Sequence, residues 1–380
     1  MMNQHDTQSS AKPASRKRNF FTKPLMIAAA SLSLSAVALP AAAGQWWSAT
    51  PSVSIGSATI NVRNKGALGN GSHNDTAAFQ AAIDTLPSSG GTVTVPAGRY
   101  MIDAVKSIRM RSHTRLQLQD GAELDVIPNS ASWHYAIRAW GVNNVVITGG
   151  KIVGERYKHK GTSGEWGMGV SVLGSSNVLV KDVNISNFWG DGVYVGANHG
   201  TRSNGVTINH VVSTGNRRQG MSITPSTHVY VVNSTFSNTQ GTLPQAGLDI
   251  EPQDQGKTDT VRLENNTFSG NRGNGIEMHA NISGISIVSN TLTTNHGFGM
   301  LAVSAPYLTI SGNHATRNGL AGVGLTSKTH NVSLQSNTLQ YNSTIYMSPT
   351  RTGGGKSRDI QIGSSTYAIT NVNTQLTPTR

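Results

Sequence analysis

The sequence predicts an all-β solenoid of about ten coils, and two observations support this fold class. A unit of 23 to 28 residues recurs from about residue 135 onward, and each unit holds a glycine, an alternating strand, a turn, a second alternating strand and an asparagine. Charged residues make up only 13% of the chain and there are 42 glycines, which is typical of short strands joined by tight turns. Residues one period apart lie on neighbouring coils of a solenoid, so the sequence can be read as a surface.

The first 43 residues are predicted to be an export signal. Arg16-Lys17-Arg18 precedes an apolar run from Leu25 to Leu39, and Pro40-Ala41-Ala42-Ala43 follows it. A basic region, an apolar region and a small-residue cleavage site in this order are typical of a secretory signal peptide. We therefore expect residues 1–43 to be removed on export to the periplasm or the extracellular space, by either the general or the twin-arginine route. Because no second apolar segment follows, no membrane span is expected after cleavage.

Residues 44–112 are predicted to form an N-terminal cap and the first strands. The segment 44–60 is expected to be a loose entry segment. The run Ala77–Leu86 is predicted to be a helix because its apolar residues lie on one helical face, and Asn74 or Asp75 can cap its first turn. An open solenoid end exposes apolar side chains and unpaired strand edges, so we expect this helix to cover it.

The same part of the chain carries three strings that match a known module: Gly66–Gly71, Asp75–Ile83 and Gly90–Tyr100. They resemble the N-terminal module of the pectate-lyase-like superfamily. The strings GERYKH, EWGMG, RRQG and GLDIEP further resemble a subgroup of secreted bacterial β-helix proteins. The resemblance implies a single-stranded right-handed parallel β-helix over residues 113–380, ending in an irregular coil. It implies no one activity, because the module occurs in lyases, hydrolases, epimerases and phage tailspikes.

Two asparagine columns recur at the repeat period, and both are interpreted as structural. Stacked asparagines at a turn can hydrogen-bond along the solenoid and satisfy turn backbone groups. The columns are Asn266, Asn290, Asn313 and Asn337, and Asn271, Asn295, Asn318 and Asn342.

The outward positions of the strand that follows each repeat glycine reveal one chemically distinctive patch. In Gly247-Leu248-Asp249-Ile250-Glu251, the apolar residues alternate with Asp249 and Glu251, so both carboxylates face outward. One period later, the same alternation places Glu277 and His279 outward. The other outward positions are serine, threonine, glycine, tyrosine or apolar residues, so Asp249, Glu251, Glu277 and His279 are the candidate catalytic residues.

Sheet geometry predicts short distances within this patch. The Cβ atoms of Asp249 and Glu277 should lie about 5 Å apart across the coils. Asp249 and Glu251 should be about 6.7 Å apart along the strand. At least one pKa should therefore rise, which gives one site both an acid and a base. The alternative is a Ca²⁺ site at Asp249, Glu251 and Glu277, because that ion prefers hard oxygen ligands.

Neighbouring coils supply candidate substrate-binding residues. An arginine beside the patch can pair with its carboxylates or bind a substrate carboxylate, and tryptophans can stack on sugar rings or pack a turn. These candidates are Asp191, Tyr194, Arg217, Arg218, Trp166 and Trp189.

The composition of the chain limits the chemical class of its binding partner. Residues 44–380 hold 25 Lys/Arg and 17 Asp/Glu, a net charge of +8, which attracts anionic partners. No basic run or basic–aromatic stripe follows residue 23, so an acidic polysaccharide is expected and nucleic acid is not. The chain has no cysteine, which excludes a disulfide framework and a thiolate metal site. A monomer is expected. No cofactor is assigned, and Ca²⁺ is the candidate cofactor if the enzyme is a lyase.

The predicted function is that of a secreted enzyme cleaving glycosidic bonds of an anionic polysaccharide, with a carboxylate-based hydrolase slightly favoured. In that version, Glu251 or Glu277 is the general acid, Asp249 the base or nucleophile, and His279 tunes the site. One alternative is a Ca²⁺-dependent lyase or a uronan epimerase, in which Arg218, Tyr194 or His279 would move the C5 proton. Another is a carbohydrate-binding solenoid without catalysis.

Overall fold

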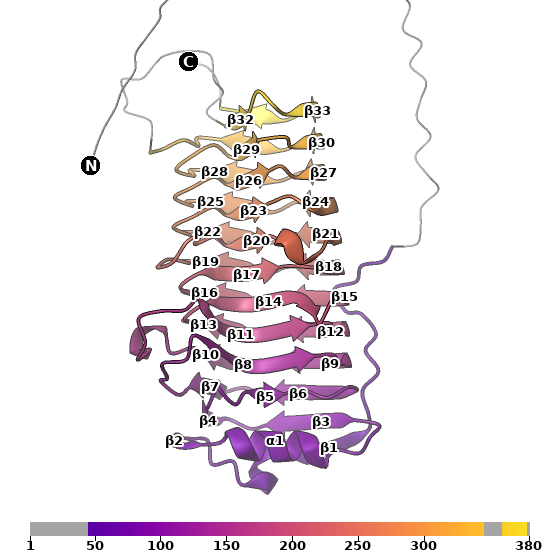
Figure 1. The fold of residues 1–380 in the computed structure, drawn as a ribbon, viewed down its shortest axis with the longest axis vertical. Helices are drawn as coiled ribbons and strands as arrows, with labels where there is room; N and C mark the ends of the chain where they lie inside the picture. Colours follow the sequence, from indigo (N-terminus) through magenta and orange to yellow (C-terminus); the bar gives the residue numbers. More distant parts are fainter. Residues whose placement is uncertain (1–44, 346–358, 378–380) are drawn as a thin grey trace, which may run out of the picture. The chain divides into compact units, whose positions relative to one another are not determined.

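The structure, a computed structural model, describes residues 45–345 and 359–377. The predicted signal peptide and the glycine-rich segment 352–356 lie outside the described residues. Gln45–Arg380 forms one compact unit. Its coils stack in sequence order as a parallel solenoid, and each full coil contributes one strand to each of three sheets (Figure 1).

Sheet A carries the second strand of each repeat. Within the described residues it consists of β1 (Ala58–Asn61), β3 (Gly91–Val95), β6 (Thr114–Leu118), β9 (Asn143–Thr148), β12 (Ser176–Lys181), β15 (Thr201–Asn209), β18 (Ser226–Val232), β21 (Thr258–Glu264), β24 (Ile282–Val288), β27 (Pro306–Ser311), β30 (His330–Gln335) and β33 (Tyr367–Val372). The residues predicted to correspond across repeats are parallel partners, as in the series Val178, Val206, Val229 and Val261.

Sheet B lines the turns that carry the asparagine columns. Its twelve strands among the described residues are β2 (Asn70–Asn74), β4 (Gly98–Ile102), β7 (Ala122–Val126), β10 (Lys151–Val153), β13 (Asn184–Ser186), β16 (Val212–Thr214), β19 (Thr235–Ser237), β22 (Thr267–Ser269), β25 (Thr291–Thr293), β28 (His314–Thr316), β31 (Thr338–Gln340) and β34 (Gln375–Leu376).

Sheet C carries the predicted site. Its described strands are β5 (Ile108–Arg109), β8 (Trp133–Trp140), β11 (Trp166–Leu173), β14 (Asp191–Asn198), β17 (Gln219–Ile223), β20 (Leu248–Ile250), β23 (Ile276–Met278), β26 (Met300–Val303), β29 (Val323–Thr326) and β32 (Ile360–Ile362). One antiparallel pairing, between β14 and β15, connects sheets A and C. Short 3-10 turns occur at η1 (Val62–Lys65), η2 (Arg156–Lys158) and η3 (Gln253–Gln255).

The core is a stack of inward-facing apolar side chains. Val193, Met221, Leu248 and Ile276 occupy equivalent positions on successive coils, and all are fully buried. The alternation of the sequence therefore has the predicted sense, with apolar members inside and the intervening residues outside.

Both asparagine columns form continuous hydrogen-bond ladders. The Oδ1 atom of Asn290 accepts from the backbone N and the Nδ2 of Asn266 at 2.9 and 3.0 Å, and the pattern repeats on the following coils. The second ladder continues from Asn342 Nδ2 to Asp359 Oδ1 at 3.0 Å. These side chains are buried and satisfied, which confirms their structural interpretation.

The predicted N-terminal helix is α1 (Thr76–Thr85), and Figure 1 shows it at the N-terminal end of the coils. Phe79 and Ile83 are fully buried. Asn74 Oδ1 accepts from the backbone N of Thr76 at 3.1 Å and so caps the first turn. Asp75 instead accepts from the backbone N atoms of Leu68 and Gly69, at 2.7 and 3.2 Å, which fixes the preceding glycine-rich loop.

The segment before β1 differs from the loose entry predicted for it. It runs along sheet A, as Figure 1 shows, and contacts strands several coils away from β1. The rings of Trp46 and His228 lie 5.1 Å apart, the guanidinium of Arg262 lies 4.4 Å from the ring centre of Trp47, and Asn209 Nδ2 donates to Ala49 O at 2.8 Å. We call residues 45–57 the N-terminal strap.

Candidate functional site

The outward column on sheet C has the register that the repeat period predicts. Tyr194, Ser222, Asp249 and Glu277 are direct parallel partners on β14, β17, β20 and β23. The ladder continues past the end of β20, because the backbone N of Glu251 donates to Ile223 O at 3.0 Å. The four candidate catalytic residues therefore lie on two adjacent coils.

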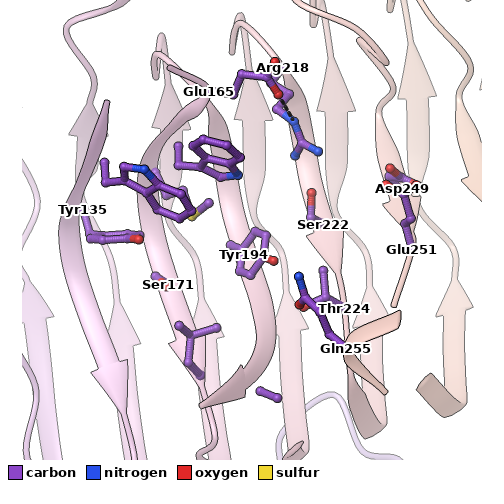
Figure 2. A pocket seen from close by; sticks show the side chains of 15 residues that line it. Tyr135, Glu165, Ser171, Tyr194, Arg218, Ser222, Thr224, Asp249, Glu251 and Gln255 are labelled. Atoms are coloured by element: carbon purple, nitrogen blue, oxygen red, sulfur yellow. Dashed lines mark ion pairs between the residues drawn. The ribbon is translucent and has the colours of Figure 1, made fainter. Parts of the chain in front are cut away.

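A pocket lies over this column and extends toward the N-terminal coils (Figure 2). Its volume is about 360 Å³, within the range of small-ligand sites. Figure 2 shows Tyr135 at one side, Asp249 and Glu251 at the other, and Tyr194 between them. The lining residues are Trp133, Tyr135, Glu165, Trp166, Met168, Ser171, Leu173, Tyr194, Ala197, Arg218, Ser222, Thr224, Asp249, Glu251 and Gln255.

Asp249 is the most deeply buried of the candidate catalytic residues, with 2% of its surface exposed. Its Oδ2 atom accepts from Gln219 Nε2 at 2.9 Å, while its Oδ1 atom is buried without a hydrogen-bond partner. Burial, reinforced by the neighbouring Glu277 charge, raises the pKa of Asp249 well above its usual value. The protonated form of Asp249 is thus favoured, whereas the sequence analysis placed the proton on Glu251 or Glu277.

His279 and Glu277 lie beside this acid. His279 Nε2 is 3.3 Å from Glu277 Oε1 and 3.5 Å from Asp249 Oδ1. Burial alone would lower the pKa of His279, but the hydrogen bond with Glu277 and the charge of Asp249 outweigh burial and raise it. Asn274 Nδ2 donates to Glu277 Oε2 at 2.8 Å and thereby orients that carboxylate.

Arg218 supplies the positive charge of the pocket. Its Nη1 atom lies 3.1 Å from Asp191 Oδ2, and its Nε atom lies 3.4 Å from Glu165 Oε2. Ser222 Oγ donates to the same Asp191 oxygen at 2.8 Å. Burial would lower the pKa of Arg218, but the charges of Asp191 and Asp249 raise it, so the guanidinium stays protonated. Asp191 is fully buried and orients Arg218 from outside the pocket lining.

The predicted aromatic residues separate into two environments. Trp166 lines the pocket and stacks on Trp133, with ring centres 4.0 Å apart. Trp189 instead stacks on His159 at 4.1 Å and lies under the guanidinium of Arg217 at 3.8 Å. The structure therefore does not bring Trp189 and Arg217 to the pocket.

Tyr194 stands at the centre of the pocket. Burial raises the pKa of its phenol and outweighs the hydrogen bond with Thr224, which would lower it, so the hydroxyl remains protonated at neutral pH. Trp133 and Tyr135 were not predicted, because they lie on the coil before Gly169, the first glycine of the regular 23- to 28-residue spacing. Alternation in Trp133-His134-Tyr135-Ala136-Ile137 was the available signal.

The metal-binding capacity of the patch differs from the predicted set. Ligand atoms of Asp249, Glu251 and His279 lie within 4.8 Å of one another, and Glu277 is not part of this group. Ca²⁺ takes six to eight oxygen ligands, and the imidazole supplies a nitrogen. The observed group is thus a weaker fit to Ca²⁺ than the predicted three-carboxylate set.

Comparison with known proteins assigns the fold and the family. Residues 59–300 match the family described as rhamnogalacturonase A/epimerase, pectate lyase-like, and residues 246–376 match the right-handed β-helix region. The chain is a right-handed parallel β-helix and belongs to this pectate lyase-like family.

Three relatives show the range of proteins that share this architecture. The chain is 30% identical over 299 residues to the uncharacterized protein YclG of Bacillus subtilis, covering 70% of this chain and 47% of YclG. The A-module of the mannuronan C-5 epimerase AlgE4 of Azotobacter vinelandii superposes with a TM-score of 0.64 at 18% identity, over 83% of this chain and 95% of that one. The surface adhesin PfbA of Streptococcus pneumoniae superposes with a TM-score of 0.61 at 16% identity, over 84% and 90%.

The chain spans about half or less of the curated relatives it matches over the longest stretches, 47% of YclG and 34% of the SPbeta prophage-derived protein YorA. Among the described residues, no helix has the length and apolar character needed to cross a membrane.

Proposed function

We propose that the protein is a polysaccharide-active enzyme that hydrolyses a glycosidic bond in the pocket of sheet C. The observation that carries this proposal is the buried Asp249 carboxyl, whose Oδ1 atom has no hydrogen-bond partner and which lines the pocket beside Glu251. A proton donor and an ionised carboxylate at one bond are the machinery of glycoside hydrolysis.

The roles follow from the environments of the two groups. Asp249 donates its proton to the glycosidic oxygen as the bond to the anomeric carbon breaks. Glu251 attacks that carbon, and a water molecule deprotonated by Asp249 then releases the sugar. Ligand atoms of Asp249 and Glu251 lie within 4.8 Å of each other, which favours the closely spaced, retaining arrangement of about 5–5.5 Å over the wider inverting one.

The position and charge of Arg218 favour an anionic substrate. Arg218 is the arginine that lines the pocket, it stays charged, and its side chain is 14% exposed. A guanidinium in such a partly enclosed position can bind a uronate carboxylate through its remaining N–H donors. The positive charge of residues 44–380 supports the same choice of substrate.

Uronate C5 chemistry, as in a lyase or an epimerase, is the second candidate, and the similarity to the AlgE4 A-module favours it. That chemistry needs a neutral or anionic base at C5. The pKa values of Tyr194 and His279 are both raised, which favours the protonated phenol and the protonated imidazole, and these forms are acids rather than bases. This direction of the shifts favours hydrolysis.

The test uses the full chain with alginate, rhamnogalacturonan and polygalacturonate, and with dextran as the uncharged control. Reducing ends, unsaturated uronate absorbance and the NMR spectrum of the polymer are recorded together. We expect new reducing ends without unsaturated uronate, on an acidic polymer only. Unsaturated products would show that the enzyme is a lyase and not a hydrolase. A changed sugar composition in an intact polymer would show that it is an epimerase.

A matched pair of variants tests the site itself. Asp249→Asn should abolish cleavage, while Asp182→Asn should not, although Asp182 also pairs with a histidine, His210, at 2.7 Å on an exposed turn. If an acidic polymer binds wild type and Asp249→Asn equally and neither cleaves nor changes it, the protein is a binding solenoid. We further propose that the protein works outside the cytoplasm, on the pattern of residues 1–43.

A further inference from the structure

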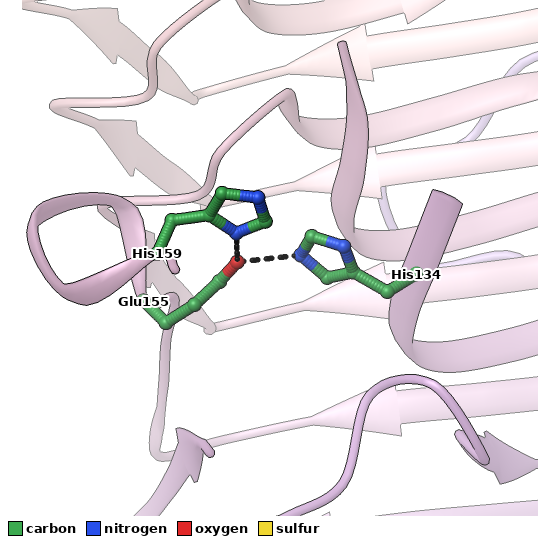
Figure 3. A group of neighbouring side chains, drawn as sticks. All are labelled: His134, Glu155 and His159. Carbon is green, nitrogen blue, oxygen red and sulfur yellow. Dashed lines mark hydrogen bonds and ion pairs between the residues drawn. The ribbon is translucent and has the colours of Figure 1, made fainter. Parts of the chain in front are cut away.

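A second group of titratable side chains lies away from the carboxylates of the pocket. It consists of His134 on β8, Glu155 after β10, and His159 after η2 (Figure 3). His134 Nε2 is 2.7 Å from Glu155 Oε1, and His159 Nδ1 is 2.8 Å from the same oxygen. All three side chains have 0% exposure. We call these residues the His–Glu–His cluster.

The cluster contains unsatisfied polar atoms. Among the described residues, His134 Nε2, His159 Nε2 and Glu155 Oε2 are buried and have no hydrogen bond of acceptable geometry. Buried polar groups are almost always paired, because an unpaired one costs about 1–3 kcal/mol. His134 Nε2 and His159 Nδ1 both lie against Glu155 Oε1, so a ligand between these atoms would interact with two of the unsatisfied groups, His134 Nε2 and the Glu155 carboxylate.

The ring nitrogens of His134 show which kind of ligand this is. Nδ1 lies 3.0 Å from the carbonyl oxygen of Ala131, so the N–H of this nitrogen donates to that oxygen. Nε2 of a neutral ring would then present a lone pair to Glu155 Oε1 at 2.7 Å, which is repulsive unless a positive species interacts with both. A histidine that binds a metal through one nitrogen and donates its other N–H to a backbone carbonyl has this arrangement.

We propose that His134, Glu155 and His159 bind a divalent transition-metal ion, with zinc the ion that this donor set fits best. Two imidazoles and a carboxylate are a known zinc ligand set, and softer nitrogen donors disfavour Mg²⁺ and Ca²⁺. Nitrogen and oxygen ligands on a tetrahedral zinc lie about 3.3 Å apart, so each pair must open by roughly half an ångström. Glu155 Oε2 can complete the coordination.

The site would fasten a loop to the solenoid. Glu155 and His159 belong to the loop 154–165, and His134 belongs to β8. Three backbone hydrogen bonds also hold the loop, from Gly154, Arg156 and Lys160. Glu165 and Trp166, which end the loop and begin β11, line the pocket. The ion would therefore be structural and would position one wall of the pocket. This inference does not depend on the proposed hydrolysis.

The experiment measures metal content of the untagged full chain after exposure to Zn²⁺ and dialysis into metal-free buffer. We expect one zinc per chain, and one Co²⁺ in its place with the absorption bands of a tetrahedral site. His159→Ala and Glu155→Gln should weaken Zn²⁺ binding at least tenfold. His210→Ala, which removes an exposed histidine of the Asp182 pair, should leave binding unchanged.

His279→Ala separates this cluster from the patch of Asp249, Glu251 and His279. Retention of zinc in His279→Ala supports the proposal, and loss of zinc in that variant overturns it. Wild type that retains no zinc also overturns the proposal, whether or not the cluster variants fold. The cluster would then be a metal-free ion pair between a histidine imidazolium and the Glu155 carboxylate. If Glu155→Gln is unfolded, the melting temperature of wild type is measured after chelation and again after readdition of Zn²⁺. A melting temperature that falls on chelation and recovers with Zn²⁺ supports the proposal, and an unchanged one overturns it.

Discussion

Two clusters on this solenoid combine buried carboxyl groups with imidazoles, and their acids behave in opposite ways. In the pocket, Asp249 has two carboxylate neighbours, Glu277 and Glu251, and burial and these charges raise its pKa despite His279 and Arg218. In the His–Glu–His cluster, burial would raise the pKa of Glu155, but its bonds to His134 and His159 lower it. Burial raises the pKa of both acids, and the balance of cationic and anionic partners decides whether that rise persists, as in Asp249, or is reversed, as in Glu155.

The comparison also separates function from structure. The acid with the raised pKa lines an open pocket, whereas the acid with the lowered pKa is sealed between a loop and β8. A protonated acid at a pocket can transfer its proton to a substrate. A sealed ionised acid has no access to a substrate, so it acts only on the groups or the ion that it contacts.

The largest expected effect is on catalysis. Asp249→Asn should lower kcat by at least about 100-fold, because the amide cannot donate a proton to the leaving group. The fold should be retained, because an amide can also accept from Gln219. Steady-state cleavage of the acidic polymer and circular dichroism check this, and an unchanged kcat would assign the proton donor elsewhere.

Glu155→Gln should instead act on stability. Removing one partner of a buried charged group leaves the other uncompensated, so we expect a loss of about 3 kcal/mol in unfolding free energy. Glu123→Gln is the control, because Glu123 is 30% exposed and pairs with Lys151 at the surface. Its effect should be below about 1 kcal/mol. Denaturant unfolding and proteolysis of the loop 154–165 provide the measurement, and equal effects of the two variants would contradict the comparison.

Trp166 and Trp189 should differ in the same way, one affecting substrate binding and the other stability. Trp166→Ala should raise KM about tenfold with a smaller change in kcat, because it removes a stacking surface from the pocket. Trp189→Ala should leave KM unchanged and lower the melting temperature, because Trp189 packs between His159 and Arg217. Steady-state kinetics and thermal melting of both variants check this, and a raised KM for Trp189→Ala would show that the pocket extends to the loop.

The smallest expected effect concerns stability and pH. Because the folded-state pKa of Asp249 is raised, its stabilising contribution is present at low pH and is lost as the pH rises through that pKa. Asp249→Asn should therefore be more stable than wild type at neutral and alkaline pH, and this advantage should shrink in acid. Asp259→Asn is the opposite control, since Arg202 and Thr227 outweigh burial and lower the pKa of Asp259. It should be less stable than wild type at neutral pH, with the difference closing in acid.

The repeat period made part of this site predictable. Once Gly247 and Gly275 are aligned, the pairing of Asp249 with Glu277 follows, and the register confirms it. The asparagine ladders follow from the same alignment. Each of these contacts joins residues one repeat period apart, so the contact can be predicted by aligning the repeats.

Contacts that break the period could not be predicted. The meeting of Glu155 with His134 depends on the path of an insertion that has no counterpart on other coils. The burial of Asp249 depends on Gln219 and on the pocket walls, so the sequence did not single out Asp249 as the carboxyl group with the raised pKa. Trp189 packs against His159 of the loop 154–165 and against Arg217, and alternation does not encode these contacts.

The N-terminal strap has a mechanical consequence. Coils of a solenoid contact mainly their neighbours, so such a rod can unravel from an end one unit at a time. Here Ala49 is tied to Asn209, and Trp47 to Arg262, while β1 pairs with β3 at the first coil. A pulling force applied at Gln45 would thus peel the strap from the middle of the rod before it reached the first coil. Separation of the first coil from the stack would therefore also require the loss of strap contacts several coils away.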